Sequence, residues 1–132
     1  MNILQPPGWA RPRGFSHGVS VKGGTTVYIA GQIGSNEKGV VEKKTFHEQF
    51  RQALANILAV LAEAGGGPEH LVRLTWYVLD LKEYHAALKD IGAAYRELIG
   101  RHYPAMAVVQ VSGLVDPEAR LEIEAAAVVP DK

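Results

Sequence analysis

One stretch near the C-terminus decides the fold: Leu121-Glu122-Ile123-Glu124-Ala125-Ala126-Ala127-Val128-Val129. Strict alternation predicts a β-strand with Leu121, Ile123, Ala125, Ala127 and Val129 on one face. Glu122 and Glu124 then project from the opposite face. Because burying an unpaired charge is costly, either that face is in contact with water or Glu122 has a functional role.

Alternation of apolar residues and turn residues predicts three further strands. Met106–Val111 is predicted as a second strand, joined to the last one by a loop over residues 112–120. Phe15–Lys22 and Thr25–Gln32, separated by Gly23-Gly24, are expected to form a β-hairpin. Residues 1–14 contain three prolines, two glycines and two arginines. They are interpreted as an irregular N-terminal arm.

Two amphipathic helices alternate with a further strand. The first helix is predicted to start at Thr45, because Glu48 follows at the spacing of a capping box. Gly65-Gly66-Gly67-Pro68 ends it. An alternating strand follows over residues 71–79, and the second helix runs from Asp80 to a stop at residue 100. The predicted order is β-β-α-β-α-β-β, an α+β fold with two helices packed on one face of a mixed sheet.

Two helices leave the other face of the sheet uncovered. This face is predicted to carry Tyr28, Val108, Gln110, Glu122 and Val128, a mixture too apolar to be left wholly in water. Self-associating domains usually form closed symmetric assemblies. A homo-oligomer is therefore expected.

Composition narrows the class of protein. The 132 residues suit one domain, residues 1–132, with 47% hydrophobic and 21% charged residues. Formal net charge is zero and no run of Lys and Arg occurs, so a nucleic-acid partner is not expected. Without cysteine, a signal-peptide pattern or a long apolar run, the expectation is a cytoplasmic protein that does not insert into a membrane.

Few residues form an evident chemical motif. The serines lie in predicted loops or near strand ends and assemble no triad, and the five histidines lack metal-ligand spacing, so no metal site is predicted. Gly31-Gln32, at the end of a strand, is of more interest. A glycine there lets a ligand approach the backbone N–H.

Six segments form a recognisable series along the chain: Gly18-Val19, Ala30-Gly31-Gln32-Ile33, Gln52 to Gly65 with Asn56-Ile57, Val72 to Asp80, Pro104-Ala105, and Leu121 to Ala125. In their order and spacing they resemble the Rid family of reactive intermediate deaminases, also called YjgF-like or L-PSP endoribonuclease-like proteins. The resemblance covers about residues 14–129.

This resemblance implies a chorismate-mutase-like fold and a homotrimer with a ligand cleft between subunits. Members of the best-known branch hydrolyse enamines or imines, derived from amino acids, to 2-keto acids and ammonia, without a cofactor. Carried over residue by residue, the backbone N–H of Gly31 would bind substrate, and Glu122 would position or activate water.

Two positions depart from the family pattern. Met106 stands where the arginine of Pro-Ala-Arg would grip the substrate carboxylate, and Phe15 stands where a tyrosine is usual. A methionine cannot replace a bidentate arginine–carboxylate pair. Standard deamination of amino-acid-derived imines is therefore doubtful.

Three hypotheses follow. In the first, the protein is a divergent enzyme for another imine or related metabolite, in a more apolar cleft lined by Phe15, Met106 and Val108 beside Ala30, Gly31 and Gln32. In the second, the cleft is a non-catalytic binding or regulatory site. In the third, a nearby loop supplies the missing charge, through Arg101, His102 or Arg13. Endoribonuclease activity, the historical alternative for the family, ranks last.

Overall fold

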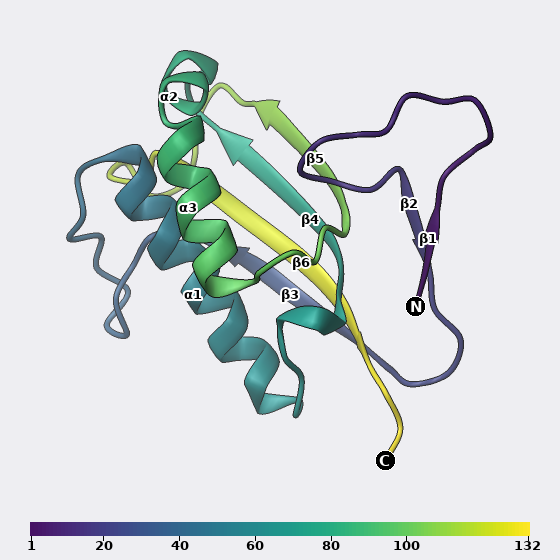
Figure 1. The fold of residues 1–132 in the computed structure, drawn as a ribbon. Helices are drawn as coiled ribbons and strands as arrows, with labels where there is room; N and C mark the ends of the chain where they lie inside the picture. Colours follow the sequence, from purple (N-terminus) through teal and green to yellow (C-terminus); the bar gives the residue numbers. More distant parts are fainter.

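The computed structural model describes all of residues 1–132 and confirms an α+β architecture (Figure 1). The strands are β1 (Asn2–Leu4), β2 (Gly18–Ser20), β3 (Thr25–Gln32), β4 (Leu71–Val78), β5 (Ala105–Gln110) and β6 (Leu121–Val129). The helices are α1 (Phe46–Glu63), α2 (Leu81–Ala86) and α3 (Leu88–Leu98), with a 3₁₀ turn, η1, at Pro68–His70.

The main sheet has the strand order β3-β6-β4-β5. Strand β6 runs antiparallel to both β3 and β4, whereas β5 is parallel to β4 and is reached through α2 and α3. The predicted alternation along β6 is confirmed, since Leu121, Ile123, Ala125 and Ala127 are buried. Glu122 is only half-buried, on the face without helices, so its charge is not sealed in the core.

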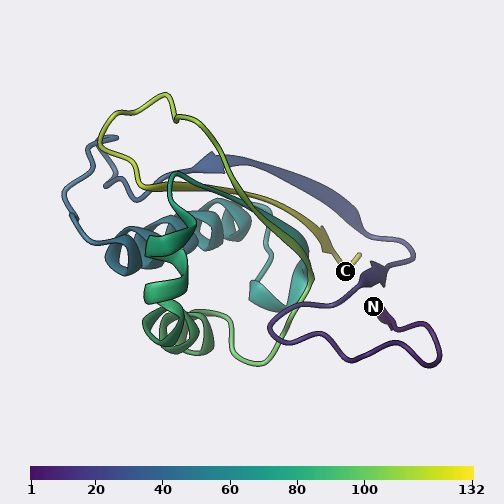
Figure 2. The same ribbon diagram turned by 90° about the horizontal axis from the view of Figure 1, so that it is seen from above.

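All three helices lie on one face of the main sheet (Figure 2). Helix α1 begins as predicted, with the Thr45 side chain accepting a hydrogen bond from the N–H of Glu48. Its apolar stripe includes Phe50, Leu54 and Ile57, which are fully buried. This stripe packs on β3 and β6, and α3 packs beside α1.

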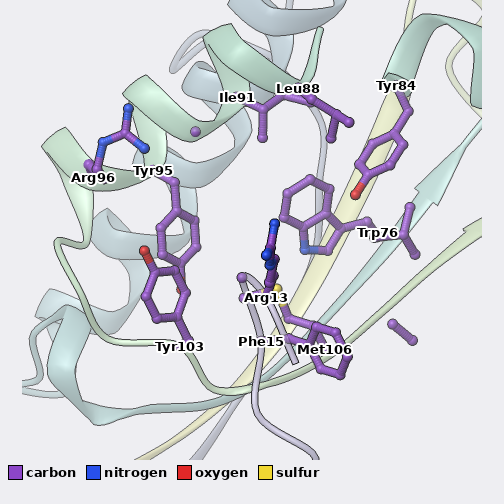
Figure 3. Close-up of a pocket in the computed structure, with 14 residues that line it drawn as sticks. Arg13, Phe15, Trp76, Tyr84, Leu88, Ile91, Tyr95, Arg96, Tyr103 and Met106 are labelled. Atoms are coloured by element: carbon purple, nitrogen blue, oxygen red, sulfur yellow. The ribbon is translucent and has the colours of Figure 1, made fainter. Parts of the chain in front are cut away.

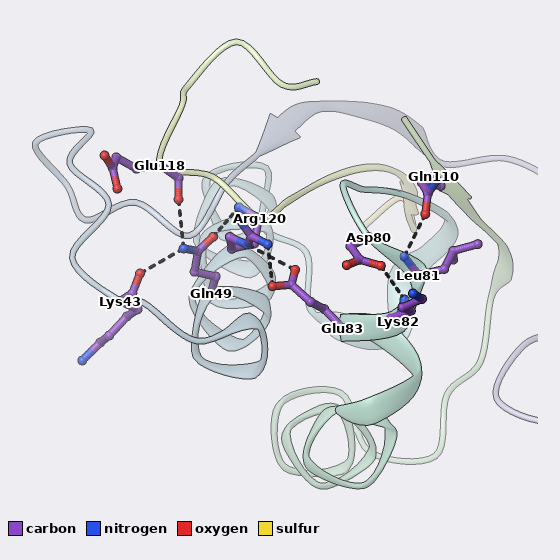
Figure 4. A network of polar contacts seen from close by, with 9 residues as sticks. All are labelled: Lys43, Gln49, Asp80, Leu81, Lys82, Glu83, Gln110, Glu118 and Arg120. Carbon is purple, nitrogen blue, oxygen red and sulfur yellow. Dashed lines mark hydrogen bonds and ion pairs between the residues drawn. The ribbon is translucent and has the colours of Figure 1, made fainter. Parts of the chain in front are cut away.

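A buried glutamine ties the loops at one end of the sheet to α1 (Figure 4). Gln49 is 1% exposed, and its Nε2 donates to the carbonyl oxygens of Lys43 and Glu118 at 2.9 and 3.0 Å. Its Oε1 accepts from the N–H of Arg120 at 2.7 Å. The Arg120 guanidinium also makes two contacts to Glu83, at 2.5 and 3.1 Å. Two loops and α2 are thereby held together.

The predicted hairpin before α1 is wrong. Strand β2 pairs antiparallel with β1, residues 2–4, in a separate two-stranded sheet that stands away from the main one (Figure 1). The arm is thus not irregular throughout. Gly23 and Gly24 do form a turn with positive φ. A turn signal, however, does not specify which strand the flanking segment pairs with, and β1 is the partner.

The second predicted helix is divided in two. Asp80 caps α2 as expected, accepting from the N–H of Lys82 at 2.8 Å. The helix then ends at Ala86, and the N–H of its C-cap residue, Ala87, is shared between the carbonyls of Glu83 and Tyr84. Ala87 is also the N-cap residue of α3. No glycine or proline marks this break, so local sequence signals could not reveal it.

The face assignment of β5 is also corrected. Its register aligns Met106 with Leu74 and Val108 with Trp76, and both partners are buried in the core. Met106 and Val108 therefore lie on the helix-covered side, and Gln110, two residues further, shares their side. They do not lie beside Glu122, because a register differing by one residue reverses every side chain. Tyr77, Val109 and Ala107 occupy the open face instead.

None of the helices combines the length and the apolar character that crossing a membrane requires.

Candidate functional site

A cavity of about 500 Å³ opens at the β5 edge of the main sheet, between α2–α3 and the N-terminal arm (Figure 3). Ten of its 14 lining residues are hydrophobic, which is typical of small-molecule pockets. The lining residues are Arg13, Gly14, Phe15, Trp76, Tyr84, Leu88, Ile91, Gly92, Tyr95, Arg96, Tyr103, Met106, Ala107 and Val108. We call this cavity the aromatic pocket.

Aromatic rings form its walls. Tyr95 and Tyr103 stack with ring centres 5.3 Å apart and planes 4° from parallel. Trp76 meets Tyr84 edge to face, with centres 6.0 Å apart. Burial raises the pKa of both Tyr84 and Tyr95 above the ordinary value of 10, so both hydroxyls stay protonated to a higher pH than an exposed tyrosine does. The hydroxyl of Tyr95 donates to the carbonyl of His102 at 2.6 Å, which holds its ring in place.

Trp76 carries an unpaired donor in this wall. Its side chain is 4% exposed, and Nε1 is the one buried side-chain nitrogen or oxygen in the chain without a hydrogen-bond partner. A buried N–H left unpaired costs free energy, so such groups are rare in folded proteins. A ligand acceptor in the pocket would satisfy it.

The charged residues that line the aromatic pocket are Arg13 and Arg96, both basic. Neither guanidinium has a carboxylate within 4.0 Å. Arg13 is brought to the pocket by the arm, which docks beside β5 through Ser16. The N–H of Ser16 donates to the carbonyl of Pro104 at 3.0 Å, and its Oγ donates to the carbonyl of Tyr103 at 2.5 Å.

A second group of candidate residues surrounds Glu122 on the other side of the sheet. The β3–β6 register shifts between Ile29 and Gln32, and this irregularity brings Gly31 against the Glu122 side chain. Glu122 makes no hydrogen bond or ion pair within the chain. Its neighbour Arg120 pairs with Glu83 instead. The carboxylate thus has no partner within the chain and is partly exposed to solvent.

The structure therefore separates the predicted site residues into two groups. Phe15, Met106 and Val108 line the aromatic pocket. Ala30, Gly31 and Gln32 end strand β3 instead, and of these Gly31 lies against the Glu122 side chain.

Of the three residues considered as a source of charge, the arm residue Arg13 lines the aromatic pocket. His102 lies outside the lining, and its Nε2 is 2.6 Å from the carbonyl of Leu71, to which it donates. Arg101 is exposed and also lies outside the lining.

Sequence reasoning missed much of the pocket lining. In the sequence, Trp76 belongs to the alternating pattern of residues 71–79, and Tyr84 and Tyr95 belong to the apolar stripe of the second amphipathic helix. These patterns indicate where the residues pack but not that they also face a cavity. Arg96 was not singled out. The only sequence signal for Arg96 is Gly92, four residues earlier on the same face of the helix. A glycine there has no side chain, which leaves space beside Arg96 for a ligand.

No group of three or more His, Asp or Glu side chains is arranged to hold a metal ion.

Comparison with known proteins identifies the family. The sequence model described as Endoribonuclease L-PSP matches residues 10–129. A RutC family protein of Pyrococcus abyssi is 34% identical over 109 residues, covering 82% of each chain. Human 2-iminobutanoate/2-iminopropanoate deaminase is 31% identical over 104 residues, covering 78% of this chain and 72% of the human protein.

A solved structure agrees over nearly the whole chain. The Rid family protein YyfB of Yersinia pestis, described as of unknown function, superposes with a TM-score of 0.85 at 33% identity, covering 97% of this chain and 98% of that one. The chain belongs to the Rid family, also known as the YjgF or L-PSP family. Its α+β architecture is the chorismate-mutase-like fold of that family.

Proposed function

We propose that this protein hydrolyses a reactive enamine or imine of a small metabolite, with release of ammonia, in a cleft formed between copies of the chain. The observation that carries the proposal is the position of Glu122. Its half-buried carboxylate has no partner within the chain and lies directly against Gly31. The similarity to the human relative, a 2-iminobutanoate/2-iminopropanoate deaminase, supports the reaction class.

The geometry supports a shared cleft. In one chain, Glu122 and Gly31 lie on the open face of the sheet, whereas the aromatic pocket lies on the helix side at the β5 edge. A cleft that contains both groups therefore needs two copies. The open face also carries exposed apolar side chains, with Tyr28 83% and Val109 42% exposed. We propose that these faces meet in a homotrimer.

In the proposed reaction, Glu122 accepts a proton as water attacks the imine carbon. The C–O bond forms while the electron pair of the C=N bond moves to nitrogen, and Glu122 passes the proton it took from water to that nitrogen, giving a neutral carbinolamine. Glu122 then takes the hydroxyl proton as the carbonyl forms, the C–N bond breaks, and the same proton passes to the departing nitrogen, which leaves as ammonia. The balance is one imine and one water in, one carbonyl compound and one ammonia out. Gly31 leaves its backbone open to a bound polar group.

A coupled assay tests the reaction. An amino-acid oxidase generates 2-imino acids from leucine, phenylalanine and alanine, and semicarbazide trapping reports how fast each imine disappears. Because Met106 replaces the family arginine, hydrolysis of these carboxylate-bearing imines by the wild-type protein should be slower than in relatives that retain it, but still measurable. Glu122→Gln should lose about 100-fold or more of this activity, in the range for a general base. Glu124→Gln is the matched control, since Glu124 lies on the same strand and face but bonds to the Tyr77 hydroxyl.

Wild-type protein without effect on any imine would overturn the proposal, as would a fully active Glu122→Gln variant.

Met106 favours a second function, a non-catalytic binding or regulatory role. The family arginine that grips a substrate carboxylate is absent at this position. In this case a small molecule would bind in the cleft without being converted, and Glu122→Gln would leave its binding unchanged.

A further inference from the structure

We infer that Arg13, delivered by the N-terminal arm, takes over anion recognition in the aromatic pocket and selects a carboxylate carried on an aromatic or bulky apolar body. The conversion of such a ligand rests on the proposed function, because it requires hydrolysis at Glu122. The binding of the ligand does not. Three observations of the chain lead to it.

The first observation is the charge of the pocket. Arg13 and Arg96 line it, no Asp or Glu does, and neither arginine is paired within the chain. Two unpaired guanidinium groups beside a largely apolar cavity attract an anion, and because both residues are exposed to solvent, which screens this attraction, direct hydrogen bonds have to hold the ligand. A guanidinium also matches a carboxylate with two parallel hydrogen bonds.

The second observation distinguishes Arg13 from Arg96. Ser16, three residues after Arg13, is buried and fixed to the backbone of Tyr103 and Pro104. Gly14, with φ of 79°, turns the chain between them. The Arg13 side chain therefore enters the cavity near Trp76 and Met106, whereas Arg96 lies on α3 beyond Tyr95 (Figure 3). Arg13 lies on the Met106 side, where the family arginine is missing.

The third observation concerns the ligand body. The stacked pair Tyr95–Tyr103 and the indole of Trp76 offer flat surfaces to a ring. Trp76 Nε1 is buried and unpaired, so its N–H would donate a hydrogen bond to a carbonyl, imine or carboxylate acceptor of a ligand in the pocket. A cavity of about 500 Å³ also exceeds what a two- or three-carbon acid would fill.

The binding of three stable probes separates the contribution of the ligand's charge from that of its aromatic ring. By calorimetry on the full-length protein, 3-phenylpropanoate should bind at least about 10-fold more tightly than propanoate, which lacks the ring. It should likewise bind more tightly than 3-phenylpropanamide, which lacks the charge. Arg13→Gln should weaken 3-phenylpropanoate binding about 10-fold and leave the amide unaffected, as expected for a charge-assisted contact.

Matched variants test the assignment. Arg11→Gln removes an exposed arginine of the same arm that does not line the pocket, and should bind like wild type. Trp76→Phe keeps a ring but removes the N–H, and should weaken both ring-bearing probes several-fold. Unchanged thermal midpoints would show that Arg13→Gln and Trp76→Phe still fold.

Three results would overturn the inference: equal binding of the acid and the amide, wild-type affinity in Arg13→Gln, or the predicted loss appearing in Arg96→Gln instead. The proposed function fails separately. If the binding contrasts hold and no imine is hydrolysed, the recognition stands and the reaction does not. If Glu122-dependent hydrolysis occurs and Arg13→Gln has no effect on KM or on binding, the reaction stands and this inference does not.

Discussion

The Glu122 side chain occupies the space that any side chain at position 31 would need. A methyl group built on Gly31 would overlap the carboxylate, and nothing else would obstruct it as closely. The two residues come from different strands, and the irregular β3–β6 pairing between Ile29 and Gln32 brings them together. Gly31 therefore sets where the Glu122 carboxylate lies.

Gly31→Ala should impair activity far more than stability. The obstructing atoms all belong to the flexible Glu122 side chain, which can swing away, so the free energy of unfolding should fall by less than about 1 kcal/mol. The displaced carboxylate should reduce imine hydrolysis nearly as much as Glu122→Gln does. Urea unfolding and the coupled assay measure the two effects.

Gly34→Ala provides the opposite contrast. There the added methyl group would lie 2.7 Å from Cα and 2.8 Å from the carbonyl oxygen of Gln49, which belong to the α1 backbone. Overpacking against backbone typically costs about 1–3 kcal/mol. Equal stability losses in the two variants would contradict this account of Gly31.

The Thr45 cap should make the stability of α1 depend on pH in the acid range. The hydrogen bond from Thr45 lowers the pKa of Glu48 below its ordinary 4.5. A depressed carboxyl pKa gives stability that is present above the unfolded pKa and is lost as pH falls through the folded one. Thr45→Ala should return the Glu48 pKa, followed by NMR, toward its ordinary value.

Loss of the cap should also lower the free energy of unfolding at neutral pH by about 1 kcal/mol. Thr45→Ser keeps a hydroxyl and serves as the control. A Glu48 titration identical in Thr45→Ala and wild type would rule out the hydrogen bond as its cause.

Gln49→Leu should be among the more destabilising single substitutions in the chain. Leucine keeps the volume but leaves the carbonyls of Lys43 and Glu118 and the N–H of Arg120 without their side-chain partner. Each buried polar group left unpaired costs about 1–3 kcal/mol, so a total loss of about 2–4 kcal/mol is expected after partial hydration.

Removing the partly exposed Arg120–Glu83 pair by Glu83→Gln should cost less, about 0.5–1 kcal/mol after solvent screening. Thermal and urea unfolding give both values. If Glu83→Gln lowered the free energy of unfolding more than Gln49→Leu, the hydrogen bonds of Gln49 would not be the main contacts that hold these loops together.

Tyr28→Asp should dissociate the proposed trimer. Tyr28 is 83% exposed on the open face of the sheet, where a charge introduced into an interface would be desolvated without a partner. Light scattering should show a shift from trimer toward monomer, with activity lost because the cleft needs two copies. Val60→Asp, at an exposed position of α1, should leave the assembly intact. A wild-type protein that is monomeric would refute the shared cleft.

The local patterns of this sequence were sufficient to predict the main elements. The alternation along β6, the apolar stripe of α1 and the caps at Thr45 and Asp80 were all confirmed. Each of these features depends on residues close together in the chain, and the spacing of the apolar residues indicates which face of the element is buried. Glu122 also attracted attention from sequence alone, because a carboxylate projecting from a central strand demands an explanation.

Only the tertiary structure decided which distant segments meet. It paired β2 with β1, ended α2 at Ala86, and set the β5 register that turns Met106 toward the helices. It also docked the arm so that Arg13 lines the aromatic pocket. These choices depend on contacts between segments far apart in the chain, and a register step of one residue exchanges the two faces of a strand. The sequence could therefore name the candidate residues, but folding sorted them into two groups on opposite sides of the sheet.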